Sequence, residues 1–228
     1  MTTWTTTGRI AAAGVELDGD LSLPDNAGGL VLFAHGSGSS RRSPRNRAVA
    51  EALNRQGLAT LLVDLLTGPE DQADAGDRRL RFDIGLLADR LIGIIDWLRW
   101  RPATAALPIG LFGASTGAAA ALVAAAARPG AVRAVVSRGG RPDLAGPAAA
   151  QVVAPTLLIV GERDTEVREL NEQACGALRA PTELRIIPAA THLFEEPGTL
   201  EQVAEQAGRW FGDHLLPARR APATGARR

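Results

Sequence analysis

The 228-residue sequence predicts an α/β fold in which a mostly parallel central sheet carries helices on both faces. Two observations support this prediction. Strand-like and helix-like segments alternate along nearly the whole chain. Several of the strand-like segments are continuously apolar, as expected for strands that are buried on both faces. No linker or internal repeat divides the chain, so residues 1–216 are expected to form a single domain.

The expected elements follow one another in a regular order. Segment 8–23 predicts two short strands, with Asp18-Gly19-Asp20 as the turn between them. Six further segments are candidate strands: 29–36, 58–66, 107–115, 131–140, 155–164 and 182–192. Apolar residues at helical spacing, or a run of alanines, predict four helices: 43–57, 82–100, 118–127 and 199–215.

Three segments are expected to lie outside this core. Residues 67–79 are too charged to be buried. The segment between the strands 131–140 and 155–164 is too short and too rich in Gly, Pro and Ala to form a cap domain of several helices. The tail 217–228 is basic, has no apolar period and is expected to be disordered.

Composition excludes several classes of function. The 25 basic and 25 acidic residues cancel, so net charge gives no argument for a nucleic-acid or membrane partner. The start of the chain lacks the pattern of a secretory signal, and the longest run of Ala, Val and Leu is about half of a ~20-residue span, so a cytoplasmic location is expected. Cys175 is the only cysteine and is expected to pack within a helix. The histidines are scattered, so neither a metal nor a cofactor is expected.

The most informative motif is Gly113-Ala114-Ser115-Thr116-Gly117, which lies between a candidate strand and the alanine-rich helix. A G-x-S-x-G sequence in that context is typical of a nucleophile elbow, a strained turn that exposes a serine hydroxyl above a sheet. The following helix also directs its positive dipole end at the serine. Ser115 is therefore the candidate nucleophile.

A serine nucleophile needs a base, and the chain has three histidines. His192 directly follows the last candidate strand, where a loop at the carboxyl edge of the sheet can reach the elbow. His35 ends an early strand and is expected to brace its loop, and His214 lies in the last helix, where exposure is expected. His192 is therefore the expected base.

The orienting acid is expected at the end of an intermediate strand. Asp164 lies just past a run of five apolar residues in the stretch TLLIVGERDTEV, which gives the chain order Ser115, Asp164, His192. Glu162 and Asp143 are the competing acids. Asp164 is preferred because its spacing places it in the loop rather than in the strand.

Hydrolysis of an ester also requires donors for the oxyanion. The backbone N–H of Thr116 is one, and the N–H of Ser37 is the expected second. Gly38 is an alternative donor and a candidate substrate contact. Arg138 ends a strand at the same edge of the sheet, where it is expected either to attract a substrate carboxylate or to form an ordinary ion pair that holds its loop.

Four stretches together resemble the α/β-hydrolase superfamily, and within it the dienelactone-hydrolase-like branch: LFAHGSGSS, GLFGASTGAAAAL, LLIVGERDTEV and ATHLFEEPGTLEQV. The resemblance covers about residues 28–215. Dienelactone hydrolases use a cysteine nucleophile, whereas this chain has Ser115. The stretch VVSRGGRPDLA also resembles a branch whose members are often fused to phosphoribosyltransferase domains.

The motifs and the resemblance together imply a serine hydrolase that cleaves small carboxylic esters through an acyl-enzyme. The alternatives are an acyltransferase or perhydrolase that uses the same triad, and a non-catalytic binding protein on the hydrolase scaffold. The expected partner is a small-molecule ester, with no nucleic acid and no membrane. The sequence does not indicate an oligomeric state.

Overall fold

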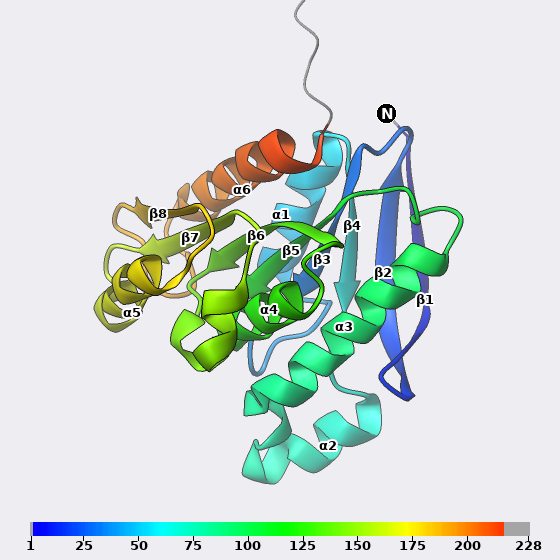
Figure 1. Cartoon of the computed structure of the whole chain (residues 1–228), viewed down its shortest axis with the longest axis horizontal. Helices are drawn as coiled ribbons and strands as arrows, with labels where there is room; N and C mark the ends of the chain where they lie inside the picture. The colour runs from blue at the N-terminus through cyan, green and yellow to red at the C-terminus, as the bar shows by residue number, and fades with distance from the viewer. Residues whose placement is uncertain (1, 217–228) are drawn as a thin grey trace, which may run out of the picture.

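The computed structural model describes residues 2–216, which form one eight-stranded sheet with helices on both sides (Figure 1). The strand order is β1-β2-β4-β3-β5-β6-β7-β8. The pairs β1–β2 and β2–β4 are antiparallel, and all the later pairs are parallel. The strands are β1 (Thr3–Ala12), β2 (Val15–Pro24), β3 (Gly29–Ala34), β4 (Leu58–Val63), β5 (Ile109–Ala114), β6 (Val132–Arg138), β7 (Thr156–Gly161) and β8 (Thr182–Ile187). The predicted α/β fold with a mostly parallel sheet is confirmed.

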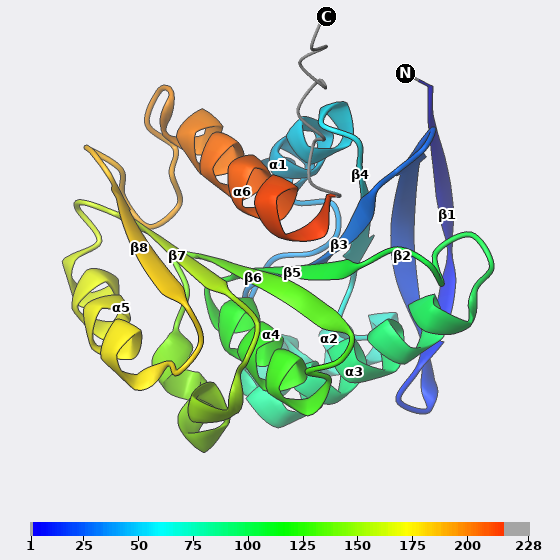
Figure 2. The same cartoon turned by 45° about the horizontal axis from the view of Figure 1, so that its top comes forward.

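Six α-helices connect or flank the strands. They are α1 (Pro44–Arg55), α2 (Gly68–Asp77), α3 (Ile84–Trp100), α4 (Thr116–Ala127), α5 (Thr165–Ala177) and α6 (Thr199–Leu215). Two segments of 3₁₀ helix, η1 (Leu80–Phe82) and η2 (Pro142–Gln151), complete the described elements. Figure 2 shows α1 and α6 on one face of the sheet and α3, α4 and α5 on the other.

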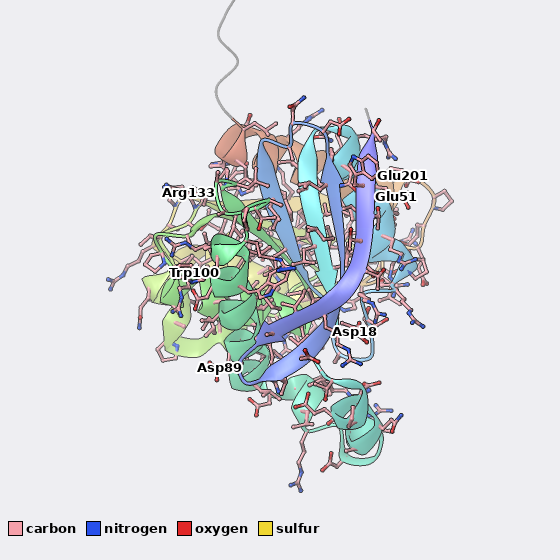
Figure 3. The ribbon with its side chains drawn as sticks, turned by 90° about the vertical axis from the view of Figure 1, so that its right-hand side faces the viewer. Asp18, Glu51, Asp89, Trp100, Arg133 and Glu201 are labelled. Atoms are coloured by element: carbon pink, nitrogen blue, oxygen red, sulfur yellow. The ribbon has the colours of Figure 1, made fainter. Side chains whose placement is uncertain are left out.

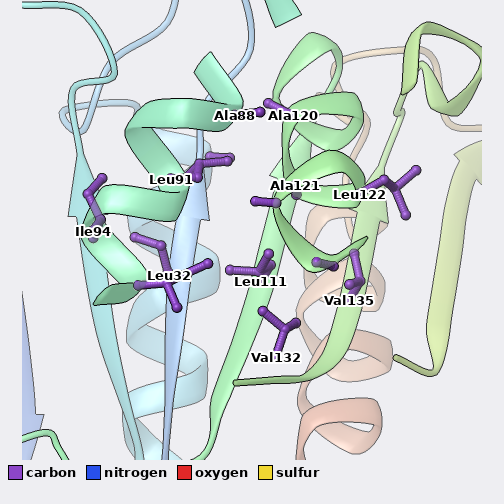
Figure 4. Close-up of a cluster of buried hydrophobic side chains, with 14 of the residues drawn as sticks. Leu32, Ala88, Leu91, Ile94, Leu111, Ala120, Ala121, Leu122, Val132 and Val135 are labelled. Atoms are coloured by element: carbon purple, nitrogen blue, oxygen red, sulfur yellow. The ribbon is translucent and has the colours of Figure 1, made fainter. Parts of the chain in front are cut away.

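Each face of the sheet has its own hydrophobic core. Toward α3 and α4, side chains such as Leu32 and Leu111 of the sheet pack against Leu91 and Ile94 of α3 and the alanines of α4 (Figure 4). The small side chains of α4 allow its backbone to lie close to β5. This close packing fixes the turn between β5 and α4, which carries Ser115.

The N-terminal hairpin differs from the expectation in the position of its turn. The two strands are joined at Ala13-Gly14, where both residues have positive φ angles of 48° and 77° and Ala12 pairs with Val15. The expected turn at 18–20 is therefore wrong, because these residues lie inside β2 and pair with β1, and Gly19 and Asp20 also pair with β4. A Cβ atom at Gly19 would lie 2.5 Å from Ile10 Cδ1, so the end of the Ile10 side chain would have to move to accommodate it.

The polar segment after β4 forms the helix α2, although it is as exposed as its charge predicts. Thr67 and Glu70 form a reciprocal capping box at its start, and Pro69 occupies the first turn. Asp74 is the single buried residue of α2. Figure 3 shows α2 projecting from the body of the molecule at the end where Asp18 lies.

The segment between β6 and β7 contains only η2, so no cap domain is inserted there. Cys175 lies in α5 and packs against the core on that face, as expected for a helix packing residue. None of the helices among residues 2–216 is long and apolar enough to cross a membrane. The expected disordered tail, 217–228, lies outside the described residues.

Candidate active site

Ser115 occupies a strained turn between β5 and α4. Its backbone has φ = 51° and ψ = −123°, a region that non-glycine residues rarely adopt. Such strain costs on the order of 1–3 kcal/mol and persists only where the surrounding structure enforces it. The backbone N–H of Ser115 donates to Arg138 O at 3.2 Å, and Ser115 O accepts from Arg141 N at 3.2 Å. The serine is half-buried, with its backbone fixed by the loop that follows β6.

The two glycines of the motif permit the close contact that enforces this strain. A Cβ atom at Gly117 would clash with Ala34 O and would lie 2.5 Å from His35 O. A Cβ atom at Gly113 would lie 2.7 Å from Ala118 N. Both obstacles are backbone atoms, which cannot rotate away as the end of a side chain can. The spacing of G-x-S-x-G therefore reflects the packing of β3, β5 and α4 around the elbow.

Asp164 and His192 form a short hydrogen bond at the same edge of the sheet. His192 Nδ1 lies 2.6 Å from Asp164 Oδ2. Asp164 follows β7 and His192 follows β8, and these strands are parallel neighbours. The carboxylate can only accept, so Nδ1 carries the proton when the ring is neutral, which leaves Nε2 as the basic nitrogen. The Asp164 side chain is 13% exposed and that of His192 is 39% exposed.

Backbone hydrogen bonds join the loops that carry these two residues. Arg163 N donates to Ala190 O at 2.9 Å, and Glu162 N donates to Ile187 O at 3.0 Å. The Glu162 carboxylate accepts from Ala189 N at 2.8 Å. Glu162, a competitor for the acid, therefore braces the loop that leads to His192.

The other competing acid, Asp143, is engaged elsewhere. It accepts two hydrogen bonds from the Arg141 guanidinium, at 2.9 Å and 2.8 Å. This partner lowers the pKa of Asp143. Of the three candidate acids, Asp164 alone contacts His192.

The loop after β6 brings the elbow and the histidine together through a residue that the sequence reasoning missed. A Cβ atom at Gly139 would lie 3.5 Å from both Cε1 and Nδ1 of His192, so the ring packs directly on this glycine. Gly139 directly follows Arg138, which binds the Ser115 backbone. Among the described side chains Ser115 Oγ makes no hydrogen bond to His192, and such contacts often tighten only when substrate binds. The Gly139-Gly140 pair after a strand is the one signal that could have indicated a close contact here.

The two residues expected to supply the oxyanion donors lie beside the nucleophile, but the N–H of Ser37 already donates to the Thr116 hydroxyl. Ser37 N donates to Thr116 Oγ1 at 3.0 Å, so the loop after β3 is attached to the first residue of α4. A Cβ atom at Gly36 would lie 3.0 Å from Ser115 Cβ, which shows how closely this loop approaches the serine. The Thr116 N–H belongs to the first turn of a helix, where backbone donors have no partner within the helix. The hydroxyl of Thr116 was not anticipated as a partner for Ser37.

The two remaining histidines are occupied elsewhere. His35 Nε2 accepts from Leu65 N at 3.0 Å, and its Nδ1–H donates to Gly36 O at 3.0 Å, so both nitrogens brace the loop. Burial lowers the pKa of His35 and keeps the ring neutral. His214 Nδ1 lies 2.8 Å from Trp210 O within α6, and the residue is half-buried rather than exposed.

The two expected substrate contacts lie in different surroundings. Arg138 is 8% exposed, and among the described residues it forms no ion pair, so the expected alternative of an ion pair that holds the loop is not found. Gly38 is exposed and has φ = 74°, and a Cβ atom at this position would meet nothing within 4 Å. It lines a neighbouring cleft.

This cleft has a volume of about 510 Å³ and opens beside the loop after β3. Its lining includes Gly36, Ser37, Thr67 and Arg81, so η1 and the start of α2 border it. Ser115 and His192 are not among its lining residues, but Gly36 and Ser37, in the loop after β3 that lies beside Ser115, are. Among residues 2–216 no group of three or more His, Cys, Asp or Glu side chains is arranged to hold a metal ion.

Comparison with known proteins identifies the family. Residues 17–212 match the dienelactone hydrolase family. The chain belongs to this family. A crystal structure of a dienelactone hydrolase from Anabaena variabilis has 57% sequence identity and a TM-score of 0.92, and the match covers 93% of this chain and 99% of that one. Est1E from Butyrivibrio proteoclasticus, at 18% identity, a TM-score of 0.75 and coverage of 91% and 98%, shares the fold. The chain has the α/β-hydrolase fold.

Two further relatives come from strains of Mycobacterium tuberculosis and carry the provisional name phosphoribosyl transferase. Each is 58% identical to this chain over 207 residues, which are 91% of this chain and 46% of the relative. The chain thus spans about half the length of these relatives.

Proposed function

We propose that the protein is a serine hydrolase that cleaves small carboxylic esters through an acyl-enzyme formed on Ser115. The observation that carries this proposal is the strained elbow of Ser115 at the same sheet edge as the hydrogen-bonded pair Asp164–His192. A nucleophile, a base and an acid that orients the base, in this chain order, are the machinery for acyl transfer to water.

The first half of the reaction forms the acyl-enzyme. His192 Nε2 accepts the proton of Ser115 Oγ while the oxygen attacks the ester carbonyl carbon. The imidazolium formed is stabilised by the carboxylate of Asp164 at 2.6 Å. When the C–O bond to the alcohol breaks, His192 returns the proton to the departing alkoxide, and the acyl group remains on Ser115.

The second half of the reaction releases the acid. A water molecule transfers a proton to His192 and attacks the acyl carbon, and the proton then returns to Ser115 as its bond to the acyl group breaks. In both halves, charge develops on the carbonyl oxygen. We assign its stabilisation to the N–H groups of Thr116 and Ser37; the N–H of Ser37 becomes free when the Thr116 side chain rotates its hydroxyl away.

The preference for small esters is supported by what surrounds the site. Only η2 separates β6 from β7, and the His192 side chain is 39% exposed, so no helical lid is inserted between these two strands to enclose a long acyl chain. We infer that the transferase in the names of the two mycobacterial relatives refers to the part of those proteins outside the matched segment, because residues 17–212 of this chain match a hydrolase family.

Hydrolysis of nitrophenyl esters of increasing chain length tests the proposal. We expect the highest kcat/KM with acetyl or butyryl esters and a loss of roughly 10³-fold or more in Ser115→Ala, because the parts of a triad act together. Ser22→Ala is the matched control, since Ser22 lies in β2 and hydrogen-bonds Thr5. Retention of most of the activity in Ser115→Ala would refute the proposal, and a maximum with long acyl chains would refute the small-ester specificity.

A further inference from the structure

Asn171 of α5 is a buried polar residue whose side chain reaches the loop after β6. The residue is 0% exposed. Its amide nitrogen donates to Val167 O at 2.7 Å, within α5, and to Gly140 O at 2.9 Å. Both partners are carbonyl oxygens, which only accept, so the nitrogen end of the amide must face them. Asn171 therefore fastens α5 to the loop after β6.

An asparagine is unfavourable at this place unless its amide is needed. Its Oδ1 atom is buried without a hydrogen-bond partner among residues 2–216, and an unsatisfied buried acceptor is destabilising. Asparagine is also a weaker helix former than leucine, which has a similar size. In an α-helix the Val167 carbonyl already accepts the Asn171 backbone N–H. The bond to Gly140 O is therefore the contact that an apolar side chain could not replace.

The loop that Asn171 holds, residues 138–141, binds the nucleophile at both of its ends. The carbonyl of Arg138 accepts the Ser115 N–H, and the N–H of Arg141 donates to Ser115 O, both at 3.2 Å. Figure 2 shows α4 and α5 on the same face of the sheet, so Asn171 approaches the loop from the side of the helix that begins after Ser115. The two ends of the loop thus move with the backbone of the nucleophile.

The middle of the same loop supports the base. A Cβ atom at Gly139 would lie 3.3 Å from His192 O and 3.5 Å from Nδ1 of the ring. A Cβ atom at Gly140 would collide with Ser137 Oγ and would lie 2.6 Å from Ala118 Cβ of α4. The two glycines are therefore packed between the histidine and α4 without room for a side chain. A shift of the Gly140 carbonyl would change how the ring is supported.

We propose that Asn171 is a positioning residue, whose bond to Gly140 holds the loop 138–141 against the His192 ring while the loop ends hold Ser115. The inference rests on the proposed esterase activity and adds to it a residue of α5 that acts through this loop. A displacement of about 1 Å between reacting groups can cost about 10²-fold in rate. Loss of the amide should therefore lower kcat, through the spacing of base and nucleophile, and leave substrate binding nearly unchanged.

A purely structural role for Asn171 makes a different prediction. If the amide only fastened α5 to the sheet, its removal would lower the fraction of folded protein and leave each folded molecule as active as before. The value of kcat per active site separates the two roles, because it does not depend on how much protein is folded. Labelling with a fluorophosphonate to completion, at Ser115, counts the active sites.

The first measurement is kcat per labelled site with p-nitrophenyl butyrate in Asn171→Leu, which keeps a similar size without a donor. We expect kcat to fall about 10- to 100-fold and KM to stay within about threefold. Asn171→Ala, which cannot overfill the site, is measured in parallel and decides the test if the leucine variant does not fold. Asn54→Leu is the matched control, because the Asn54 amide of α1 donates to Leu58 O at 2.9 Å on the opposite face of the sheet. Its kcat per site should stay within about twofold of the wild type.

A double-mutant cycle with Gly139→Ala tests whether the effect travels through the loop. Gly139 has φ = 50°, which favours glycine, and its Cβ position faces His192, so this variant disturbs the loop at the ring and should also lower kcat. If Asn171 acts through the same loop, the two losses should not multiply. The double variant should retain at least about fivefold more activity than the product of the single losses predicts.

An unchanged kcat per site in either Asn171 variant or in Gly139→Ala would overturn the positioning role. Losses that multiply in the double variant, or a loss in Asn54→Leu as large as that in Asn171→Leu, would also overturn it. In each case, ester hydrolysis and labelling of the wild-type protein would leave the proposed esterase intact. Absence of both in the wild-type protein would instead contradict the proposed function itself.

Discussion

Replacement of Asp164 by asparagine tests the electrostatic role of the acid while preserving its size. The carboxylate lies 2.6 Å from His192 Nδ1, with 13% of its side chain exposed. Two unit charges at this distance attract by about 6 kcal/mol at an effective dielectric constant of about 20, and by about 1.6 kcal/mol in water. Since His192 is more exposed than Asp164, we take an intermediate value of about 4 kcal/mol, which corresponds to roughly a 10³-fold loss of kcat.

The assay is steady-state hydrolysis of a short nitrophenyl ester at neutral pH, with circular dichroism as the check on folding. Asp164→Asn is expected to lose roughly 10³-fold in kcat with little change in KM, because the charge acts on an imidazolium that forms only during the reaction. The matched controls are Glu162→Gln and Asp143→Asn, which remove one negative charge at neighbouring positions. Both are expected to retain activity within about tenfold, since Glu162 holds Ala189 N and Asp143 holds Arg141.

The controls make the assignment of the acid falsifiable. A loss in Glu162→Gln or Asp143→Asn as large as that in Asp164→Asn would show that the wrong acid has been assigned. Activity of Asp164→Asn within tenfold of the wild type would refute the electrostatic argument.

Two further perturbations test the packing of the site. Gly117→Ala should lower the free energy of unfolding by about 3 kcal/mol in urea denaturation, because the new Cβ would meet backbone oxygens. Gly212→Ala, where a Cβ would lie in open space on α6, should raise the free energy of unfolding by about 0.5–1 kcal/mol. Similar free energies for the two variants would contradict the close approach at Gly117. Because burial lowers the pKa of His35 below its ordinary 6.5, the unfolded chain binds a proton that the folded chain does not, so stability should fall as pH drops below about 6.5. His35→Gln should flatten this dependence in urea titrations between about pH 5 and pH 7, and an unchanged slope would refute it.

The candidate triad was predictable because its signals are local and ordered along the chain. Ser115 lies in a short glycine-containing motif between two strongly patterned elements, and Asp164 and His192 each directly follow a strand. The carboxyl ends of parallel strands meet at one edge of a sheet, so the order of the strands along the chain was enough to bring the acid and the base together.

Other features depend on contacts that the sequence does not display. The glycine at position 19 suggested a turn, but it lies inside β2, opposite Gly8 of β1, and the end of the Ile10 side chain lies over it. The true turn uses Ala13, a residue with no preference for positive φ. The sequence did not predict the helix α2, because Asp74 is its single buried residue and the segment therefore has no apolar period. The capping box at Thr67 and Glu70 was the one helix signal present.

The same limit applies within the site. The spacing after the strand favoured Asp164 over Glu162, but nothing in the sequence indicated that Glu162 braces the His192 loop. The absence of a counter-ion for Arg138 is likewise visible only in three dimensions.

The central claim is that Ser115 is the nucleophile, and covalent labelling tests it most directly. The wild-type protein is treated with a fluorophosphonate, digested and analysed by tandem mass spectrometry. We predict that the phosphonyl group is found on Ser115, that labelling is lost in Ser115→Ala, and that it slows by orders of magnitude in His192→Ala, because the serine then lacks its base. Ester hydrolysis by a protein that is not labelled at Ser115, or labelling that persists at another residue in Ser115→Ala, would contradict the account.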